Sequence, residues 1–134
     1  MTLGERQELF SRLLPRLIVE AHRLGHEVRL KELQRSERQS RWNATHCGVC
    51  QQTKAHRNHP TKHKFSPIGI VNSLHRDCLA IDLVLTSKGL PLRYSEEYAE
   101  LGKFWEGLHE LCCWGGRFKR PDGGHFSITY QGRK

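Results

Sequence analysis

The chain has 134 residues and a formal net charge of +8, with 22 Lys and Arg residues against 14 Asp and Glu residues. This length is enough for one domain with its own core, so we expect a single domain over residues 1–134, and no apolar run approaches the roughly 18 residues of a membrane span. The five cysteines are an odd number, which argues against a disulfide framework and favours free thiols in a reducing compartment. The basic charge favours polyanionic partners, either nucleic acid or the bacterial envelope.

The N-terminal half predicts two helices with a strand between them. Thr2 and Glu5 have capping-box spacing, and apolar residues recur at helical spacing as far as Leu24, just before Gly25. We therefore expect a helix over residues 2–24, kinked or split at Pro15. A strand over residues 28–33 and a helix over residues 36–44 follow. The polar, histidine-rich stretch 45–67 is interpreted as a long loop.

The C-terminal half predicts more strands around one helix. A buried strand is expected over residues 78–85, followed by a turn at 87–89 and a returning strand over 91–94. Ser95 is expected to cap a helix that runs to about Leu111 and ends before Trp114-Gly115-Gly116. Residues 125–130 alternate between two faces, as in a strand. Because helices and strands are mixed without βαβ regularity, the predicted class is α+β.

Asp82 is the first chemical anomaly, because a carboxylate inside an apolar strand is costly to bury unless it pairs with a cation or binds metal. His75 precedes it by seven residues, and His125 begins the last strand. Two imidazoles and one carboxylate form a catalytic type of zinc site, with a fourth position left for water. Asp122, three residues before His125, is placed to act on that water. Taken singly, an ion pair for Asp82 and simple turn chemistry for Asp122 remain alternatives.

Together these residues resemble a known family. Ser73-Leu74-His75 with Leu79-Ala80-Ile81-Asp82, and Trp114-Gly115-Gly116 with Asp122-Gly123-Gly124-His125-Phe126, resemble the two signatures of the zinc D-alanyl-D-alanine carboxypeptidase and L-alanyl-D-glutamate endopeptidase family. That family includes phage endolysins. The stretch from Glu32 to Gln39 is similar to its Tyr-Arg-Ser/Thr…Gln segment. Two positions depart from the family pattern: Cys78 stands where Gly is frequent, and Gln34 replaces the Tyr before the Arg.

The resemblance implies a fold shared with the hedgehog signalling domain, a small antiparallel sheet flanked by helices. It implies one catalytic zinc held by His75, Asp82 and His125, with Asp122 as the catalytic acid/base. It further implies that Arg35 holds substrate or the developing oxyanion; Ser73 contacts substrate or serves only as a turn residue.

An Asp at the position of Asp122 resembles the L-alanyl-D-glutamate endopeptidases. We therefore expect a monomeric phage or prophage lysin that cuts peptidoglycan. A D-alanyl-D-alanine carboxypeptidase with the same site is the alternative. The first residues lack a basic segment followed by an apolar one, so we expect synthesis in the cytoplasm without a signal peptide and action on the wall after release.

A second cluster lies in the histidine-rich stretch. Cys47 and Cys50 have metal-knuckle spacing and, with His56 and His59, are candidate ligands of a structural zinc. A polar loop with incidental histidines is the alternative. The spacing is too short for a DNA-binding finger, which needs about 12 residues between its Cys and His pairs.

Three other classes of function compete with a zinc peptidase. A zinc-knuckle nucleic-acid-binding protein is supported by the charge, by the Cys47/Cys50 pair and by the basic run 54–64, but it leaves Asp82 unexplained, so nucleic acid is the less favoured partner. A noncatalytic binding module is disfavoured because Asp122 and all three proposed ligands are present. A cysteine nucleophile at Cys112 or Cys113 would need a histidine in reach, and core packing explains these cysteines better.

Overall fold

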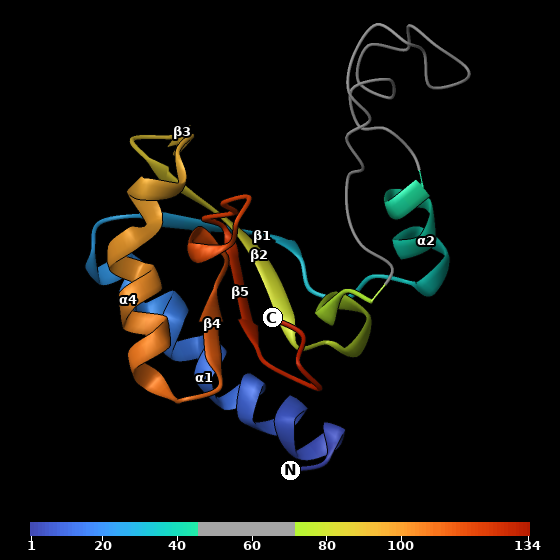
Figure 1. Ribbon diagram of the computed structural model, residues 1–134. Helices are drawn as coiled ribbons and strands as arrows, with labels where there is room; N and C mark the ends of the chain where they lie inside the picture. Colours follow the sequence, from blue (N-terminus) through green and yellow to red (C-terminus); the bar gives the residue numbers. More distant parts are fainter. Residues whose placement is uncertain (46–71) are drawn as a thin grey trace, which may run out of the picture.

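The computed structural model describes residues 1–45 and 72–134 (Figure 1). The helices in this part of the chain are α1 (Leu3–Arg23), α2 (Glu37–Thr45) and α4 (Ala99–Leu108), with short 3-10 helices η1 (Leu74–Asp77), η2 (Ser95–Tyr98) and η3 (Gly115–Arg117). The strands are β1 (Glu27–Glu32), β2 (Ala80–Ser87), β3 (Leu90–Pro91), β4 (Cys112–Trp114) and β5 (His125–Ile128). This arrangement confirms the predicted α+β class with a small antiparallel sheet. Among the described helices, none is both long and apolar enough to cross a membrane.

The sheet has the order β1-β2-β5-β4, and every neighbouring pair is antiparallel. The short strand β3 pairs with the end of β2 through a two-residue turn at Lys88 and Gly89, which have φ angles of 51° and 78°. Two positive φ angles are what a tight hairpin turn requires. Strand β5 lies between two neighbours, as β2 does, and is buried along its whole length.

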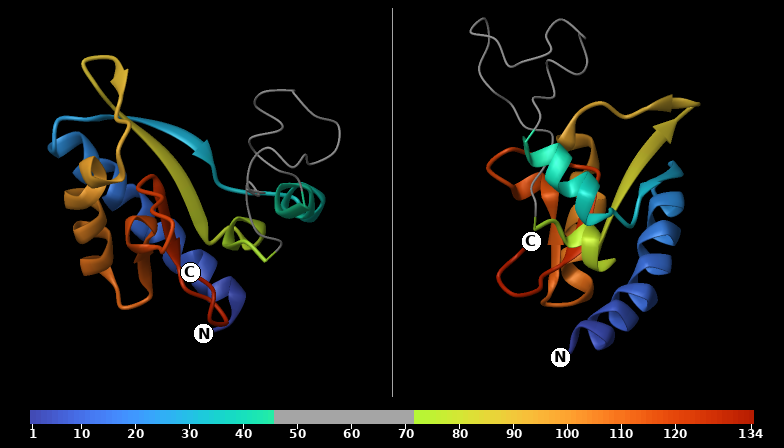
Figure 2. Two further views of the ribbon diagram at one scale, coloured as in Figure 1. Left: turned by 45° about the horizontal axis from the view of Figure 1, so that its top comes forward. Right: turned by 90° about the vertical axis from the view of Figure 1, so that its right-hand side faces the viewer.

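The hydrophobic core lies between α1, α4 and one face of the sheet. Phe10 of α1 contacts Trp105 of α4 edge to face, with ring centroids 5.9 Å apart, and Trp105 in turn contacts Phe126 of β5 at 6.3 Å. The indole N–H of Trp105 donates to the Ser127 carbonyl at 3.0 Å, so this buried polar group is satisfied. Helix α2 lies apart from these two helices (Figure 2). Among the described elements, α1 and α4 supply the helical side of this core.

Helix α1 begins as predicted but is not divided. Its capping box is present, since Thr2 Oγ1 accepts from the Glu5 N–H at 3.2 Å and the Glu5 carboxylate accepts from the Thr2 N–H at 2.6 Å. Of the two expected effects of Pro15, a split is wrong, because the helix runs unbroken from Leu3 to Arg23, and a kink stays a prediction. Pro15 is exposed, so water can reach the carbonyl that loses its helical donor there. Gly25 follows the end of the helix with φ 90°.

Several predicted boundaries in the C-terminal half shift. The strand expected from residue 78 begins at Ala80, because Cys78 has left-handed backbone angles (φ 53°, ψ 37°) and closes η1. The helix expected as far as Leu111 ends at Leu108, since His109 is extended. Cys112 and Cys113 therefore lie in β4 rather than at a helix end. The returning hairpin strand is limited to residues 90–91, and the last strand ends at 128.

Candidate metal centre

Three of the predicted metal ligands meet on the polar face of the sheet. Asp82 of β2 and His125 of β5 are direct partners across the antiparallel pair, and η1 brings in His75. Asp82 Oδ1 lies 3.3 Å from Nε2 of His75 and 3.3 Å from Nδ1 of His125. One ligand atom from each residue lies within 4.8 Å of the others, so the group could hold a metal ion. The two histidines are buried and Asp82 is partly buried.

The orientation of His75 is fixed by its neighbours. Its Nδ1 lies 3.3 Å from the Leu33 carbonyl, which accepts the ring N–H and leaves the Nε2 lone pair facing Asp82. The Arg35 backbone N–H donates to the His75 carbonyl at 3.0 Å. Ser73 is buried, and its hydroxyl accepts from the His75 backbone N–H at 3.3 Å to cap η1. The structure therefore gives Ser73 a turn role, and its contact with substrate stays a prediction.

The electrostatics of Asp82 fit a cation. Its Oδ1 is buried and has no hydrogen-bond partner among the described residues, because the two 3.3 Å contacts do not have hydrogen-bond geometry. Burial alone would raise the pKa of Asp82, but attraction to His125 and His75 in their protonated forms outweighs burial and holds that pKa well below its ordinary value. An ionised, unsatisfied carboxylate oxygen between two imidazoles is costly without a cation. Two nitrogens and one oxygen match the ligand set of a catalytic zinc.

Asp122 lies on a turn that is held from several sides. Its backbone N–H donates to the Gly115 carbonyl at 2.9 Å, and the indole N–H of Trp114 donates to the Gly123 carbonyl at 2.8 Å. The expected helix cap at Ser95 is wrong, because the Ser95 hydroxyl instead accepts from the Gly123 N–H at 2.9 Å. A Cβ on Gly115 would lie 2.4 Å from the Asp122 carbonyl oxygen. Glycine at 115 therefore permits the close approach that positions this turn beside His125.

The environment of Asp122 favours its protonated form. Desolvation by the surrounding protein raises the pKa of Asp122, and the negative charge of Asp82 raises it further. His125, Lys31 and His75 partly offset this rise. The residue as a whole is nevertheless exposed at the protein surface. A carboxyl group that holds its proton more tightly is suited to both accepting and returning a proton.

Arg35 lies beside the same centre and is bound by Glu32. Its Nε donates to Glu32 Oε1 at 2.7 Å and its Nη2 donates to Glu32 Oε2 at 2.7 Å. This bidentate pair raises the pKa of Arg35, burial opposes the rise, and the charges of Asp82 and Asp122 add to it. Glu32 could not be recognised as part of the centre from the sequence, because the residue pattern of its strand gives it no distinguishing signal.

Within the part of the chain that the structure describes, the other candidate sites do not form a second reactive centre. Cys47, Cys50, His56 and His59 lie outside the described residues, so a second zinc there stays a prediction. Burial raises the pKa of the Cys112 thiol to about 12 and also raises the pKa of Cys113. Neither thiol is poised to ionise, which argues against a cysteine nucleophile in β4.

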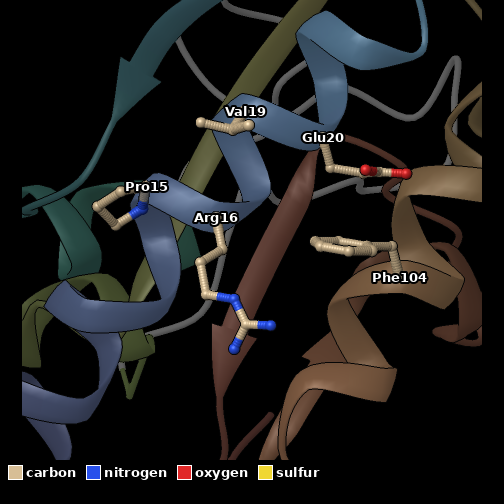
Figure 3. A pocket seen from close by; sticks show the side chains of 5 residues that line it. All are labelled: Pro15, Arg16, Val19, Glu20 and Phe104. Atoms are coloured by element: carbon tan, nitrogen blue, oxygen red, sulfur yellow. The ribbon is translucent and has the colours of Figure 1, made fainter.

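A surface hollow between α1 and α4 lies outside the metal centre. Figure 3 shows the five side chains that line it: Pro15, Arg16, Val19, Glu20 and Phe104. None of them is a histidine or cysteine, and none belongs to the metal centre. The hollow therefore does not supply the chemistry that the sequence analysis predicted.

The fold is similar to that of a known peptidase. The structure resembles the L-Ala D-Glu endopeptidase ChiX of Serratia marcescens, with a TM-score of 0.55 and 21% sequence identity over 88% of this chain and 79% of that chain. At this identity the likeness establishes the fold. No family model and no curated protein matches the chain.

Proposed function

We propose that this protein is a zinc-dependent peptidase that hydrolyses the L-alanyl-D-glutamate bond in peptidoglycan stem peptides. One observation carries the proposal: His75, Asp82 and His125 present ligand atoms within 4.8 Å of one another, and Asp82 Oδ1 lacks a hydrogen-bond partner among the described residues. The similarity of the fold to an L-Ala D-Glu endopeptidase supports the substrate class. The Asp at position 122 supports the endopeptidase activity over the carboxypeptidase activity.

The residues of the centre divide the chemistry among them. His75, Asp82 and His125 would hold the zinc, which when bound supplies Lewis-acid chemistry that makes water nucleophilic near neutral pH. Asp122 accepts the proton of the attacking water and returns it to the departing amine of D-glutamate. Arg35 places its positive charge against a substrate carboxylate or the developing oxyanion.

The biological setting follows from the same proposal. A lysin of phage or prophage origin, made in the cytoplasm and acting on the wall after release, would act as a monomeric single-domain enzyme. The net charge of +8 supports its retention on the anionic bacterial envelope. DNA binding that weakens as salt is raised, by a protein without peptidase activity, would favour the nucleic-acid-binding alternative instead, and no binding even at low salt would exclude it.

Mass spectrometry of digested peptidoglycan tests the proposed bond. Purified walls are incubated with zinc-loaded wild type, with Asp122→Ala, and with Glu96→Ala as a control that removes an exposed carboxylate outside the centre. The wild type and Glu96→Ala are expected to expose new amino groups on D-glutamate, while Asp122→Ala does so at least about 100-fold more slowly, the usual size of an acid/base contribution. Release of terminal D-alanine would assign a carboxypeptidase, and equal rates for Asp122→Ala would contradict its role.

A further inference from the structure

An irregularity in β1 places Glu32 beside the metal centre. Leu30 is opposite Leu83 in the β1–β2 pair. The next residue of β2 in the pair, Asp82, is opposite Glu32, so the register shifts by one residue between Leu30 and Glu32. Without this β-bulge, Lys31 would be opposite Asp82. Directly opposite residues lie on the same face of a sheet, and bulges re-aim side chains in this way. The bulge therefore places the carboxylate of Glu32 directly opposite Asp82.

This shift aligns three acidic and basic groups across the sheet. Glu32, Asp82 and His125 occupy one row over β1, β2 and β5, since Asp82 is the direct partner of both of the others. Among the described residues, Glu32 makes no hydrogen bond or ion pair with the proposed ligands; its two carboxylate oxygens instead bind Arg35 at 2.7 Å each. The Arg35 side chain is only 12% exposed and that of Glu32 is 28% exposed. The pair is thus a partly buried, bidentate contact rather than a surface ion pair.

The geometry of this contact leaves one edge of Arg35 available. A guanidinium group has five N–H donors in a fixed plane, and Glu32 takes one from Nε and one from Nη2. Within residues 1–45 and 72–134, the Arg35 side chain makes no other hydrogen bond. The edge formed by Nη1 and the second N–H of Nη2 can donate hydrogen bonds to a planar carboxylate or an oxyanion. The Arg35 main chain is also fixed, because its N–H donates to the His75 carbonyl.

We propose that Glu32 is a positioning residue that aims this free edge of Arg35 at an oxyanion or carboxylate of the bound peptide. Asp82 and Asp122 both act electrostatically on Arg35, and without Glu32 the guanidinium would be free to pair with either of them. Pairing with Asp82 would occupy a proposed metal ligand, and pairing with Asp122 would occupy the proposed acid/base. Glu32 thus keeps Arg35 near these carboxylates without binding them. This inference rests on the proposed peptidase function.

A double-mutant cycle on a synthetic stem peptide tests the inference. Values of kcat and KM are measured for wild type, Glu32→Ala, Arg35→Ala and the double variant, all zinc-loaded. Glu32→Gln keeps the shape of the side chain and one acceptor, and Glu27→Gln removes an exposed carboxylate from the other end of β1, opposite Thr86, as a matched control. Zinc content and melting temperature are measured on each variant.

We expect Glu32→Ala to lower kcat/KM about 100-fold, Glu32→Gln about 10-fold, and Glu27→Gln not measurably. The double variant is expected to be no worse than Arg35→Ala, because Glu32 acts through Arg35. A loss in kcat assigns the free edge to the oxyanion, and a rise in KM assigns it to a substrate carboxylate. Every variant is expected to keep one zinc ion bound at the centre formed by His75, Asp82 and His125.

Three results would overturn the inference while the proposed function stands. The first is an active wild type with unchanged kinetics in Glu32→Ala and Glu32→Gln, and the second is that the losses of Glu32→Ala and Arg35→Ala multiply in the double variant. The third is that the losses in both Glu32 variants follow only from lost zinc or lost folding. A wild type that cleaves no stem peptide when zinc-loaded contradicts the proposed function itself, and the inference fails with it.

Discussion

Adding zinc to the metal-free protein is expected to raise its melting temperature by about 10 °C at a free zinc concentration 100 times Kd. The three ligand atoms come from η1, β2 and β5, so only the folded chain brings them within 4.8 Å. A ligand that binds only the folded state stabilises it by RT ln(1 + [L]/Kd), which is about 2.7 kcal/mol at this concentration. An unfolding entropy of about 2.1 cal/mol/K per residue gives roughly 0.28 kcal/mol/K for 134 residues. The ratio of these two quantities is the expected shift.

Scanning calorimetry of chelator-treated protein with and without zinc measures this shift. His125→Ala and Asp82→Asn each remove one ligand and are expected to lose most of the shift. The Cys47→Ser/Cys50→Ser variant is expected to keep it, because those cysteines do not contribute to the proposed centre. If Asp82→Asn shows the same zinc-dependent shift as the wild type, the metal binds elsewhere and the reasoning from the His75–Asp82–His125 geometry is refuted.

Three further substitutions test individual features of the centre. The pKa of Asp122 in the folded protein is raised above the ordinary 3.8, so ionisation of Asp122 destabilises the folded state once the pH exceeds that value. Asp122→Asn should therefore stabilise the metal-free protein at pH 7, by less than about 1 kcal/mol because the residue is exposed. Below about pH 3 the substitution should have no such effect. Urea unfolding at both pH values checks this, and destabilisation at pH 7 would be contrary to it. Cys78 has φ 53°, so Cys78→Gly should relieve about 1–2 kcal/mol of backbone strain, partly offset by the flexibility of glycine, and raise the melting temperature by about 2 °C; a lower value would disprove the strain. Gly115→Ala would place a Cβ 2.7 Å from Cβ of His125 and should lower the free energy of unfolding by about 1–3 kcal/mol and weaken zinc binding. Gly107→Ala, which has open space around it, should do neither. Equal effects of the two substitutions would contradict a steric role of Gly115.

The proposed ligands were predictable because each stands out chemically from its surroundings. Asp82 is a charge within an apolar strand, and in the structure its carboxylate lies beside His75 and His125. His125 begins a strand of clear alternation, and the antiparallel register makes it the direct partner of Asp82. The overall class followed from the same patterns. The sequence alone could not supply the register, because pairing depends on how β2 and β5 meet in the folded sheet.

Two of the three features that escaped prediction depend on contacts between distant segments. Ser95 has the residue type of a helix cap, but a hydrogen bond from Gly123 takes its hydroxyl. Cys78 was expected in the strand, because nothing in a cysteine indicates a left-handed backbone. Glu32 reaches the centre only through a β-bulge, and strict alternation would have placed Lys31 there. For Ser95 and Glu32 a contact between distant segments overrides a local preference, whereas the backbone of Cys78 is set by the local turn that closes η1.

The most direct test of the central claim is the amount of cleaved stem peptide formed as zinc is titrated into metal-free protein. The Cys47→Ser/Cys50→Ser variant, which removes the candidate second site, is used so that the bound zinc reports only on the centre formed by His75, Asp82 and His125. We predict no product without metal and a linear rise to a plateau at one zinc per protein. Full activity in the metal-free protein, or no activity at one zinc per protein, would contradict the assignment of a zinc peptidase.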